Sequence, residues 1–315
     1  MKYFIAFLSI FLLPIFNLHS QNNSLMNYTP IELKTITGKI YGTQTLPTNF
    51  NGKIPVVLII AGSGATDRDG NNPMMKNNSL KQMADELAVN GIASVRFDKR
   101  GIGESKQAGK TESDLRFDDY IQDANNWINL IRQNKIFSKV IVIGHSEGSL
   151  IGMNAAINAD GYISLAGAGN SADVLLKSQL GAKGEQFKDL CFPIIDSLRD
   201  GKLVENINPN LNILFRASIQ PYMISWFKHN PQNDIKQLKF ASLIIQGDND
   251  LQVSVNDARL LASSNKRSKL VIIEKMNHVL KIIESGNRSD NSASYNDANM
   301  PISSQLIETI VKYIK

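Results

Sequence analysis

The chain has 315 residues, of which 43% are hydrophobic and 20% charged, and its formal net charge is +5. This ordinary globular composition excludes a disordered chain, a collagen-like repeat and a disulfide-rich scaffold. Cys191 is the single cysteine, so no intramolecular disulfide can form, and no Cys/His cluster has zinc-ligand spacing. We therefore expect no metal and no cofactor. The basic residues are scattered, which indicates no nucleic-acid partner.

The N-terminus has the pattern of a secretory signal peptide. Lys2 precedes an apolar stretch over residues 3–18, and Ser20 then leads into a polar run. The apolar stretch is shorter than the roughly 20 residues that span a bilayer. We therefore expect residues 1–20 to be cleaved rather than kept as a membrane anchor. The mature chain, residues 21–315, is then exported to the periplasm or the outside without membrane insertion.

The mature chain alternates between strand-like and helix-like segments. Residues 31–42 alternate and are rich in β-branched side chains, which predicts an antiparallel hairpin. Continuous apolar runs then predict strands buried on both faces of a parallel sheet, at 54–61, 93–97, 140–143, 162–165, 242–245 and 270–273. Helical spacing is found at 80–90, 117–134 and 303–315. This order predicts an α/β fold, with a mostly parallel sheet covered by helices on both faces.

Two stretches depart from the alternation. Residues 170–238 have helical patches but no strand-like run, and we expect an inserted helical cap over the edge where the strands end. Apolar cap residues such as Trp226 would pack against the body or line a substrate cleft, and Cys191 would be a bystander. Residues 285–300 are polar and rich in Asn and Ser, which predicts a surface loop before the last helix.

The strongest motif is Gly-His-Ser-Glu-Gly at residues 144–148, which matches G-x-S-x-G. It follows a predicted buried strand and precedes a helix-compatible stretch, which is the context of a nucleophile elbow. The two glycines let the backbone close around the serine without Cβ clashes. Ser146 is therefore the predicted nucleophile. The alternative is a glycine-rich strand-to-helix turn with an idle serine.

A serine hydroxyl needs a positioned base, and the base needs an acid. His278 follows the last predicted buried strand, so its loop lies at the same sheet edge as the elbow. We predict His278 as the base, whereas His145 should pack beneath the elbow and His229 should lie on the surface of the cap. Asp250 follows the penultimate strand and is the better candidate for the acid. Asp248 is its main competitor.

The loop Ala-Gly-Ser-Gly-Ala at residues 61–65 follows the first long buried strand. Its backbone can aim an N–H group inward. We predict that the N–H groups of Ser63 and Glu147 form an oxyanion hole, since Glu147 follows the nucleophile. The loop lacks the phosphate-binding pattern G-x-x-x-x-G-K-[ST], so it is not predicted to bind a nucleotide.

Together these motifs resemble the α/β-hydrolase superfamily of serine hydrolases over nearly the whole mature length. They are most similar to bacterial EstD-like carboxylesterases and the related serine-aminopeptidase-like hydrolases. The matching segments are 61–71, 98–105, 144–148, 220–222 with 225–226, 246–250 and 277–281. The resemblance supports the serine–acid–histidine order and selects Asp250, because the acid commonly stands three residues after a glycine at this strand end. Ala61 stands where a histidine is usual, but the resembled subgroup also tends to lack it.

The resemblance implies an α/β-hydrolase fold and cleavage of small-molecule esters, with short acyl chains favoured, through an acyl-enzyme on Ser146. Asp67, Arg68 and Asp69 are interpreted as loop-ordering residues. Within the same fold, an aminopeptidase or amidase is the alternative, because both activities use the same triad. An inactive α/β-hydrolase that serves as a binding module is a further alternative.

Overall fold

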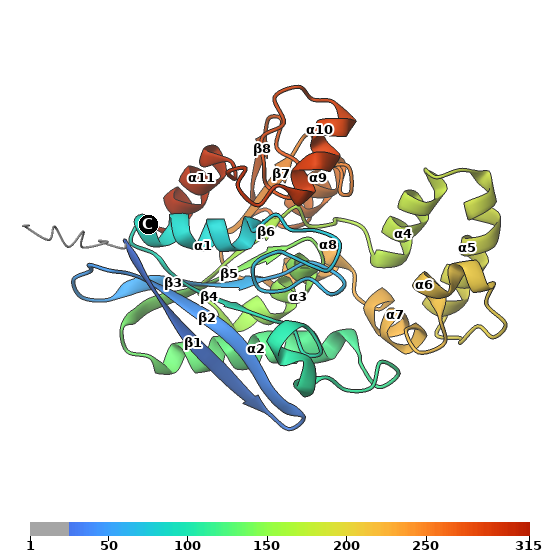
Figure 1. The fold of residues 1–315 in the computed structure, drawn as a ribbon, viewed down its shortest axis with the longest axis horizontal. Helices are drawn as coiled ribbons and strands as arrows, with labels where there is room; N and C mark the ends of the chain where they lie inside the picture. The colour runs from blue at the N-terminus through green and yellow to red at the C-terminus, as the bar shows by residue number, and fades with distance from the viewer. Residues whose placement is uncertain (1–24) are drawn as a thin grey trace, which may run out of the picture.

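A computed structural model describes residues 25–315, and the predicted signal peptide lies outside the described residues. These residues form one eight-stranded sheet with the order β1-β2-β4-β3-β5-β6-β7-β8 (Figure 1). The strands are β1 (Met26–Thr35), β2 (Gly38–Pro47), β3 (Ile54–Ile60), β4 (Ala93–Phe97), β5 (Phe137–His145), β6 (Gly161–Leu165), β7 (Ser242–Gly247) and β8 (Lys269–Ile273). Each predicted apolar run falls on one of these strands.

The sheet is antiparallel only at its N-terminal edge. β1 pairs with β2, and β2 pairs with β4, in antiparallel register. Every pairing from β4 through β8 is parallel. Both predictions, the N-terminal hairpin and the mostly parallel sheet, are therefore confirmed.

Helices cover both faces of the sheet, because the central strands are apolar on both. On β3, Val56 and Leu58 contribute to one hydrophobic cluster and Val57 and Ile59 to the other, and all four side chains are buried. One cluster lies under α2 (Phe117–Gln133), α3 (Glu147–Ala155) and α9 (Val255–Ser264). The other lies under α1 (Ser79–Val89) and α11 (Ser304–Ile314). This is the helix-covered sheet that the sequence predicts.

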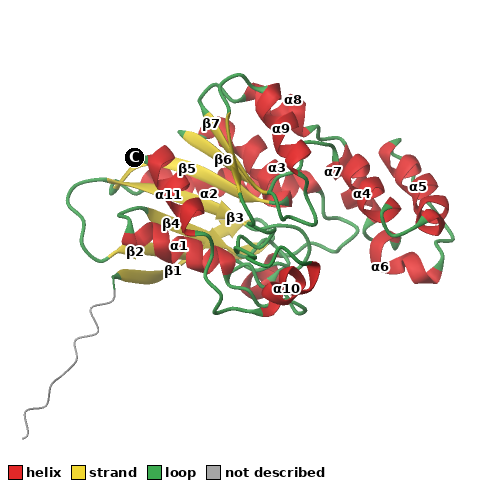
Figure 2. Cartoon of the chain, turned by 90° about the horizontal axis from the view of Figure 1, so that it is seen from above, coloured by secondary structure: helices red, strands yellow, loops and turns green. Residues whose placement is uncertain are grey.

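Between β6 and β7 the described chain forms helices only. These are α4 (Ala172–Gly181), α5 (Glu185–Arg199), α6 (Asn212–Phe215), α7 (Gln220–Phe227) and α8 (Pro231–Asp234). Helices α4 to α7 extend from one end of the molecule and pack on a hydrophobic cluster of their own (Figures 1 and 2). Cys191 is buried in that cluster, together with Ile195 and Phe215. We call the segment α4–α7 the cap.

The prediction of a plain surface loop at residues 285–300 is wrong. This stretch contains α10 (Arg288–Ala293) and the 3-10 helix η5 (Ser294–Asn296). The side chains of Asn291 and Ser294 are buried, because both form hydrogen bonds with loops of the body. The other 3-10 helices are η1 (Gly103–Ala108), η2 (Ala156–Asn158), η3 (Pro209–Leu211) and η4 (Ile235–Gln237). Within residues 25–315, no helix is long and apolar enough to cross a membrane.

Candidate active site

Ser146 lies on a sharp turn between β5 and α3, with a φ of 55°. A non-glycine residue in this region is strained, so the surrounding structure must enforce the turn. A Cβ at Gly144 would lie 2.1 Å from the carbonyl oxygen of Gly148, and a Cβ at Gly148 would lie 2.4 Å from that of Ile60. Both glycines are therefore needed for α3 to start this close to the ends of β3 and β5.

His278 and Asp250 form a buried hydrogen-bonded pair beyond β8 and β7. His278 Nδ1 lies 2.8 Å from Asp250 Oδ2, and the Asp250 side chain is 0% exposed. Asp250 Oδ1 accepts hydrogen bonds from the backbone N–H groups of Gln252 and Val253. Gln246 Nε2 donates to Asp250 Oδ2 at 3.0 Å. The carboxylate can therefore hold a proton on Nδ1, which leaves Nε2 of a neutral ring as the acceptor.

The same contacts keep Asp250 ionised. Burial alone would raise the pKa of this carboxyl, but His278 and the two backbone donors outweigh burial, and the pKa lies below its ordinary value. Asp248 has a different place. Its Oδ1 accepts the backbone N–H of Lys275 at 2.6 Å, so it joins the loops after β7 and β8 and is not the carboxylate that bonds His278.

His145 packs beneath the elbow and also supports the neighbouring histidine. Its Nε2 lies 2.8 Å from the backbone carbonyl oxygen of His278, and the two imidazole rings are 4.9 Å apart. Burial and the nearby His278 lower the pKa of His145 to about 4. A neutral His145 with its proton on Nε2 therefore donates a hydrogen bond to the loop that carries His278.

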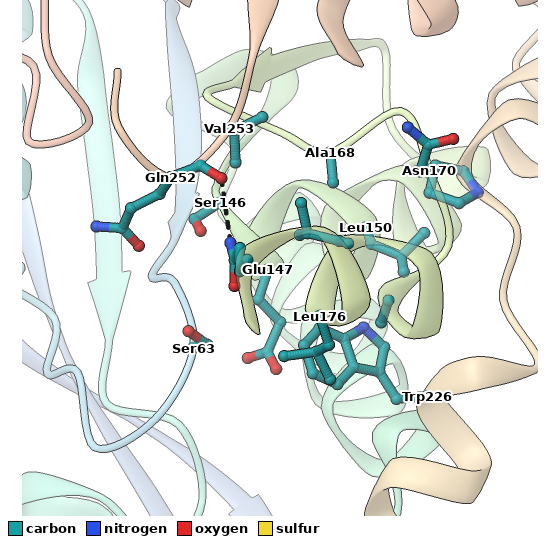
Figure 3. A pocket seen from close by; sticks show the side chains of 14 residues that line it. Ser63, Ser146, Glu147, Leu150, Ala168, Asn170, Leu176, Trp226, Gln252 and Val253 are labelled. Atoms are coloured by element: carbon teal, nitrogen blue, oxygen red, sulfur yellow. Dashed lines mark hydrogen bonds between the residues drawn. The ribbon is translucent and has the colours of Figure 1, made fainter. Parts of the chain in front are cut away.

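The loop at residues 61–65 closely approaches Ser146. A Cβ at Gly62 would lie 3.2 Å from Ser146 Cβ, so only glycine allows this approach without a shift. Ser63 follows Gly62 and faces the start of α3, where Ser146 and Glu147 lie (Figure 3). Glu147 is the first residue of α3, and the first N–H groups of a helix have no partner within it. Ser63 and Glu147, which carry the two predicted oxyanion donors, therefore line the same cavity as Ser146.

Two cavities meet at Ser146 and Ser63. The first, of about 110 Å³, lies on the cap side and is lined largely by apolar side chains (Figure 3). Its apolar lining includes Leu150, Leu176 and Trp226. The second, of about 210 Å³, is more polar. Its lining includes His145, His278, Asn72, Asn77 and Tyr295.

Gln252 lines both cavities and lies between them. Its backbone carbonyl accepts a hydrogen bond from Gln179 Nε2 of α4 at 3.1 Å. Its side-chain Nε2 donates to the hydroxyl of Tyr295 at 3.0 Å. Burial raises the pKa of Tyr295 to about 12, so its hydroxyl stays protonated at neutral pH. Gln252 thus links the cap to the segment at residues 285–300 across the site.

Sequence reasoning missed a buried polar cluster beside the elbow. Lys99 Nζ donates to Glu147 Oε2 at 2.9 Å and to the carbonyl oxygen of Gly62 at 2.6 Å. The hydroxyl of Tyr222, in α7, donates to Glu147 Oε1 at 2.7 Å. These residues belong to the segments that carry the family resemblance, but nothing in the linear sequence shows that they meet. The one sequence feature that could have indicated this cluster is Glu147, a charged residue at the start of a largely apolar helix.

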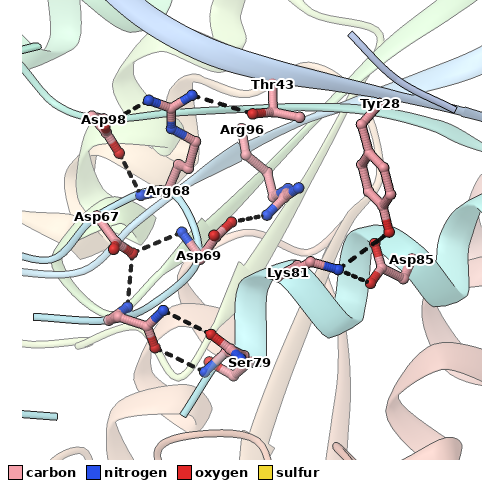
Figure 4. Close-up of polar contacts among 12 residues, drawn as sticks. Tyr28, Thr43, Asp67, Arg68, Asp69, Ser79, Lys81, Asp85, Arg96 and Asp98 are labelled. Carbon is pink, nitrogen blue, oxygen red and sulfur yellow. Dashed lines mark hydrogen bonds and ion pairs between the residues drawn. The ribbon is translucent and has the colours of Figure 1, made fainter. Parts of the chain in front are cut away.

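The segment at residues 67–71 has the loop-ordering contacts that the sequence interpretation assigned to it (Figure 4). Asp67 Oδ1 accepts the backbone N–H groups of Asp69 and Asn71. The guanidinium of Arg68 lies 2.7 Å from the carboxylate of Asp98. Asp69 forms an ion pair with the buried Arg96 of β4. These contacts fix the loop to the sheet edge.

His229, expected on the surface of the cap, is only partly exposed. The side chain is 17% exposed and lies between the carboxylates of Asp118 and Asp234, at 3.3 and 3.7 Å. Burial would lower the pKa of His229, but these carboxylates raise it above the ordinary value. His229 also contacts the ring of Phe117, so it packs between α2 and the end of the cap. Among residues 25–315, no His, Cys, Asp and Glu side chains cluster to hold a metal.

Comparisons with known proteins show which families and structures this chain resembles. The profile of the family described as Serine aminopeptidase, S33 matches residues 76–211. Esterase EstD from Thermotoga maritima is 25% identical over an alignment of 264 positions, which covers 78% of this chain and 59% of that protein. The chain therefore spans about three fifths of the length of this curated relative.

Solved structures support the fold. Est1E from Butyrivibrio proteoclasticus, with ferulic acid bound, superposes with a TM-score of 0.58 and 17% identity, over 90% of this chain and 96% of Est1E. The esterase EaEST from Exiguobacterium antarcticum gives a TM-score of 0.54 and 17% identity, over 90% of this chain and 98% of EaEST. The protein therefore has the α/β-hydrolase fold, and its sequence resembles the serine hydrolases of the EstD and serine aminopeptidase kinds.

Proposed function

We propose that this protein is a serine carboxylesterase that forms an acyl-enzyme on Ser146. The observation that carries the proposal is the buried His278–Asp250 pair, because His278 and the strained Ser146 line one cavity. The similarity to Esterase EstD points to the same chemistry. No metal or cofactor is needed for this reaction.

The reaction would proceed in two halves. Ser146 Oγ attacks the ester carbonyl carbon while His278 Nε2 takes the hydroxyl proton, and the N–H groups of Ser63 and Glu147 hold the developing oxyanion. The tetrahedral intermediate collapses as His278 returns the proton to the leaving alcohol. Water, deprotonated by His278, then attacks the acyl-enzyme, and the carboxylic acid is released with Ser146 restored.

The two cavities suggest how the ester is oriented. His278 must reach the leaving oxygen, and it lines the polar cavity but not the apolar one. The alcohol part would therefore occupy the polar cavity, and the acyl part would occupy the apolar cavity of about 110 Å³. A cavity of this size supports a preference for short acyl chains.

The test combines an active-site probe with an ester series. We expect a fluorophosphonate to label the wild type at Ser146 and not Ser146→Ala. Ester turnover by Ser146→Ala should fall by about 10⁴-fold or more, because the nucleophile is lost. Among p-nitrophenyl esters, kcat/KM should peak at a short acyl chain. Ester turnover retained by Ser146→Ala would refute the mechanism, and an unlabelled wild type would favour an inactive binding module.

An aminopeptidase or amidase is the second candidate, favoured by the family profile over residues 76–211. An aminopeptidase needs a free acidic group to bind the substrate's ammonium. Glu147 is the acidic side chain of the apolar cavity, and its carboxylate is already bonded by Lys99 and Tyr222. This pairing favours the esterase. Comparison of p-nitrophenyl acetate with aminoacyl p-nitroanilides separates the two, since faster cleavage of the anilides would support the peptidase.

A further inference from the structure

One buried ammonium group connects the two backbone segments that carry the predicted oxyanion donors. Lys99 follows β4 and is 1% exposed. Its Nζ lies 2.6 Å from the carbonyl oxygen of Gly62 and 2.9 Å from Glu147 Oε2. It also lies 5.0 Å from the centre of the Tyr120 ring. A buried charge is retained only where it is paired and hydrogen-bonded, and these contacts supply its partners.

The contact with Gly62 bears directly on Ser63. The Gly62 carbonyl and the Ser63 N–H belong to one peptide unit, which is planar and trans, so the two groups point in opposite directions. A hydrogen bond that fixes the carbonyl therefore also fixes the direction of the N–H. A peptide whose carbonyl accepts a hydrogen bond from a cation is also polarised, which strengthens its N–H as a donor.

The contact with Glu147 bears on the second donor. The Glu147 side chain is held at both oxygens, by Lys99 Nζ and by the hydroxyl of Tyr222 at 2.7 Å. Its backbone N–H is the first of α3 and directly follows Ser146. The side chain therefore anchors the residue that carries the second predicted donor, and Tyr222 extends this anchor into the cap helix α7.

We propose that Lys99 and Glu147 are positioning residues that set the spacing and direction of the two oxyanion donors, with Tyr222 as their link to the cap. This inference rests on the proposed function. It assigns to the buried ion pair a role in stabilising the transition state, beyond a role in folding. Lys99 lines neither cavity, and the Glu147 carboxylate, which borders the apolar cavity, is bonded by Lys99 and Tyr222. Both residues therefore act through the backbone of Ser63 and Glu147.

The first experiment separates rate from substrate binding. Loss of one oxyanion donor costs about 100- to 1000-fold in rate, so misplacement of both should cost about 10- to 100-fold. In Lys99→Met we expect kcat for p-nitrophenyl acetate to fall by about this factor, with KM changed by less than about threefold. Tyr222→Phe, which removes one hydroxyl, should reduce kcat by only a few-fold.

The matched control is a second buried ion pair at the same strand end. Arg100 Nε lies 2.7 Å from Asp123 Oδ2, and both side chains are buried. Asp123→Asn should lower the melting temperature as Lys99→Met does, but should leave kcat near the wild-type value. A drop in kcat in the control equal to that in Lys99→Met would overturn the inference, because any loss of a buried pair would then suffice.

A double variant covers the case in which Lys99→Met fails to fold. Lys99→Met with Glu147→Leu removes both charges, and replacing a whole buried pair by apolar residues is often neutral for stability. We expect this variant to be more stable than Lys99→Met and still to show the reduced kcat. A double variant that is stable and has wild-type kcat would overturn the proposal.

The affinity for a transition-state analogue distinguishes positioning of the donors from a purely structural role, which would leave that affinity unchanged. Ser146 Oγ would add to the carbonyl carbon of a trifluoromethyl ketone while His278 takes the hydroxyl proton. The ketone oxygen then becomes an oxyanion that the two predicted donors would bind. We expect its Ki to rise in Lys99→Met in parallel with the loss in kcat/KM, while inhibition by the carboxylic acid product stays constant. If the wild type hydrolyses esters and the Ki of Lys99→Met is unchanged, this inference is wrong but the proposed function stands. A wild type that hydrolyses no ester would overturn the proposed function as well.

Discussion

Single residues in this site owe their properties to close backbone packing and to burial. Ser146 has a φ of 55°, a conformation that a serine adopts only when its neighbours impose it. The flanking Gly144 and Gly148 allow the close packing that imposes it, because a Cβ at either position would overlap a backbone oxygen. His145 is the clearest case of burial. Its pKa falls to about 4, although it lies next to Ser146, the predicted nucleophile, in sequence.

The lowered pKa of His145 predicts a loss of stability in acid. The unfolded chain binds a proton on this side chain near pH 6.5, whereas the folded chain does so only near pH 4. The contribution to stability is therefore fully present above pH 6.5 and is lost as the pH falls towards 4, by about 3 kcal/mol in all. His145→Gln can still donate to the carbonyl of His278 and removes this titration.

Urea denaturation at pH 7.5 and pH 4.5 measures the effect. We expect His145→Gln to be less stable than the wild type at pH 7.5, because the amide packs less well beneath the elbow. The deficit should shrink or reverse at pH 4.5. A difference in unfolding free energy that is the same at both pH values would contradict the assignment.

At the scale of elements, the segment at residues 285–300 holds the loops that carry Asp250 and His278. Asn291 Nδ2 donates to the carbonyl oxygen of Asn249 at 2.7 Å, and its Oδ1 accepts from Asn277 at 3.2 Å. Asn277 Nδ2 also donates to Ser294 Oγ. The residues before Asp250 and before His278 are therefore joined through one short helix. We expect the spacing of Asp250 and His278, the predicted acid and base, to depend on α10, an element that lies outside the sheet.

Removal of this link should disturb stability and rate together. Asn291→Ala leaves the partly buried carbonyl of Asn249 without this partner, at a cost of about 1–3 kcal/mol. The amide of Asn277 keeps only its bond to Ser294. We expect a lower denaturation midpoint and a lower kcat at neutral pH. Ser292→Ala, on the exposed side of α10, is the control and should match the wild type in both measurements. A wild-type kcat in Asn291→Ala would show that α10 does not position the loops.

At the scale of the whole molecule, the candidate site lies at the carboxyl ends of the parallel strands, and the cap borders it on one side. The cap has its own hydrophobic cluster, built from α4, α5, α6 and α7. It reaches the body at Tyr222, which bonds Glu147, and at Gln179, which bonds the carbonyl of Gln252. The site is therefore formed between two packed units that meet at Ser146, and the apolar cavity lies where they meet.

The prediction at this scale is that the chain is exported and its signal peptide cleaved, which we propose from the sequence alone. The described fold begins with β1 at Met26, so cleavage after about residue 20 would remove no part of it. The loss of Lys2 would lower the formal net charge from +5 to +4. We expect the intact mass of the protein from the periplasm or the medium to match a chain that starts near Gln21. A full-length mass in that fraction would contradict the signal peptide.

The sequence determined the sheet well, because its strands are buried on both faces. Runs such as residues 54–61 are apolar without interruption, which is typical of a parallel strand covered on both faces. The chemistry-bearing positions could also be named, since Ser146, Asp250 and His278 each follow a strand. The structure places Asp250 against His278, at 2.8 Å. Residues 285–300 were predicted wrongly, because Asn and Ser favour loops in isolation and reveal nothing of buried partners.

What only the tertiary structure decided is the set of contacts between segments far apart in the chain. Lys99 meets Glu147 across 48 positions of sequence, and Tyr222 meets Glu147 across 75. His229 is partly buried, with two carboxylates beside its ring. Periodicity and local motifs report which face of an element is buried, but not which distant side chain lies opposite. The sequence by itself therefore determined the fold and the predicted nucleophile, base and acid, and the packing of cap on body decided how they are supported.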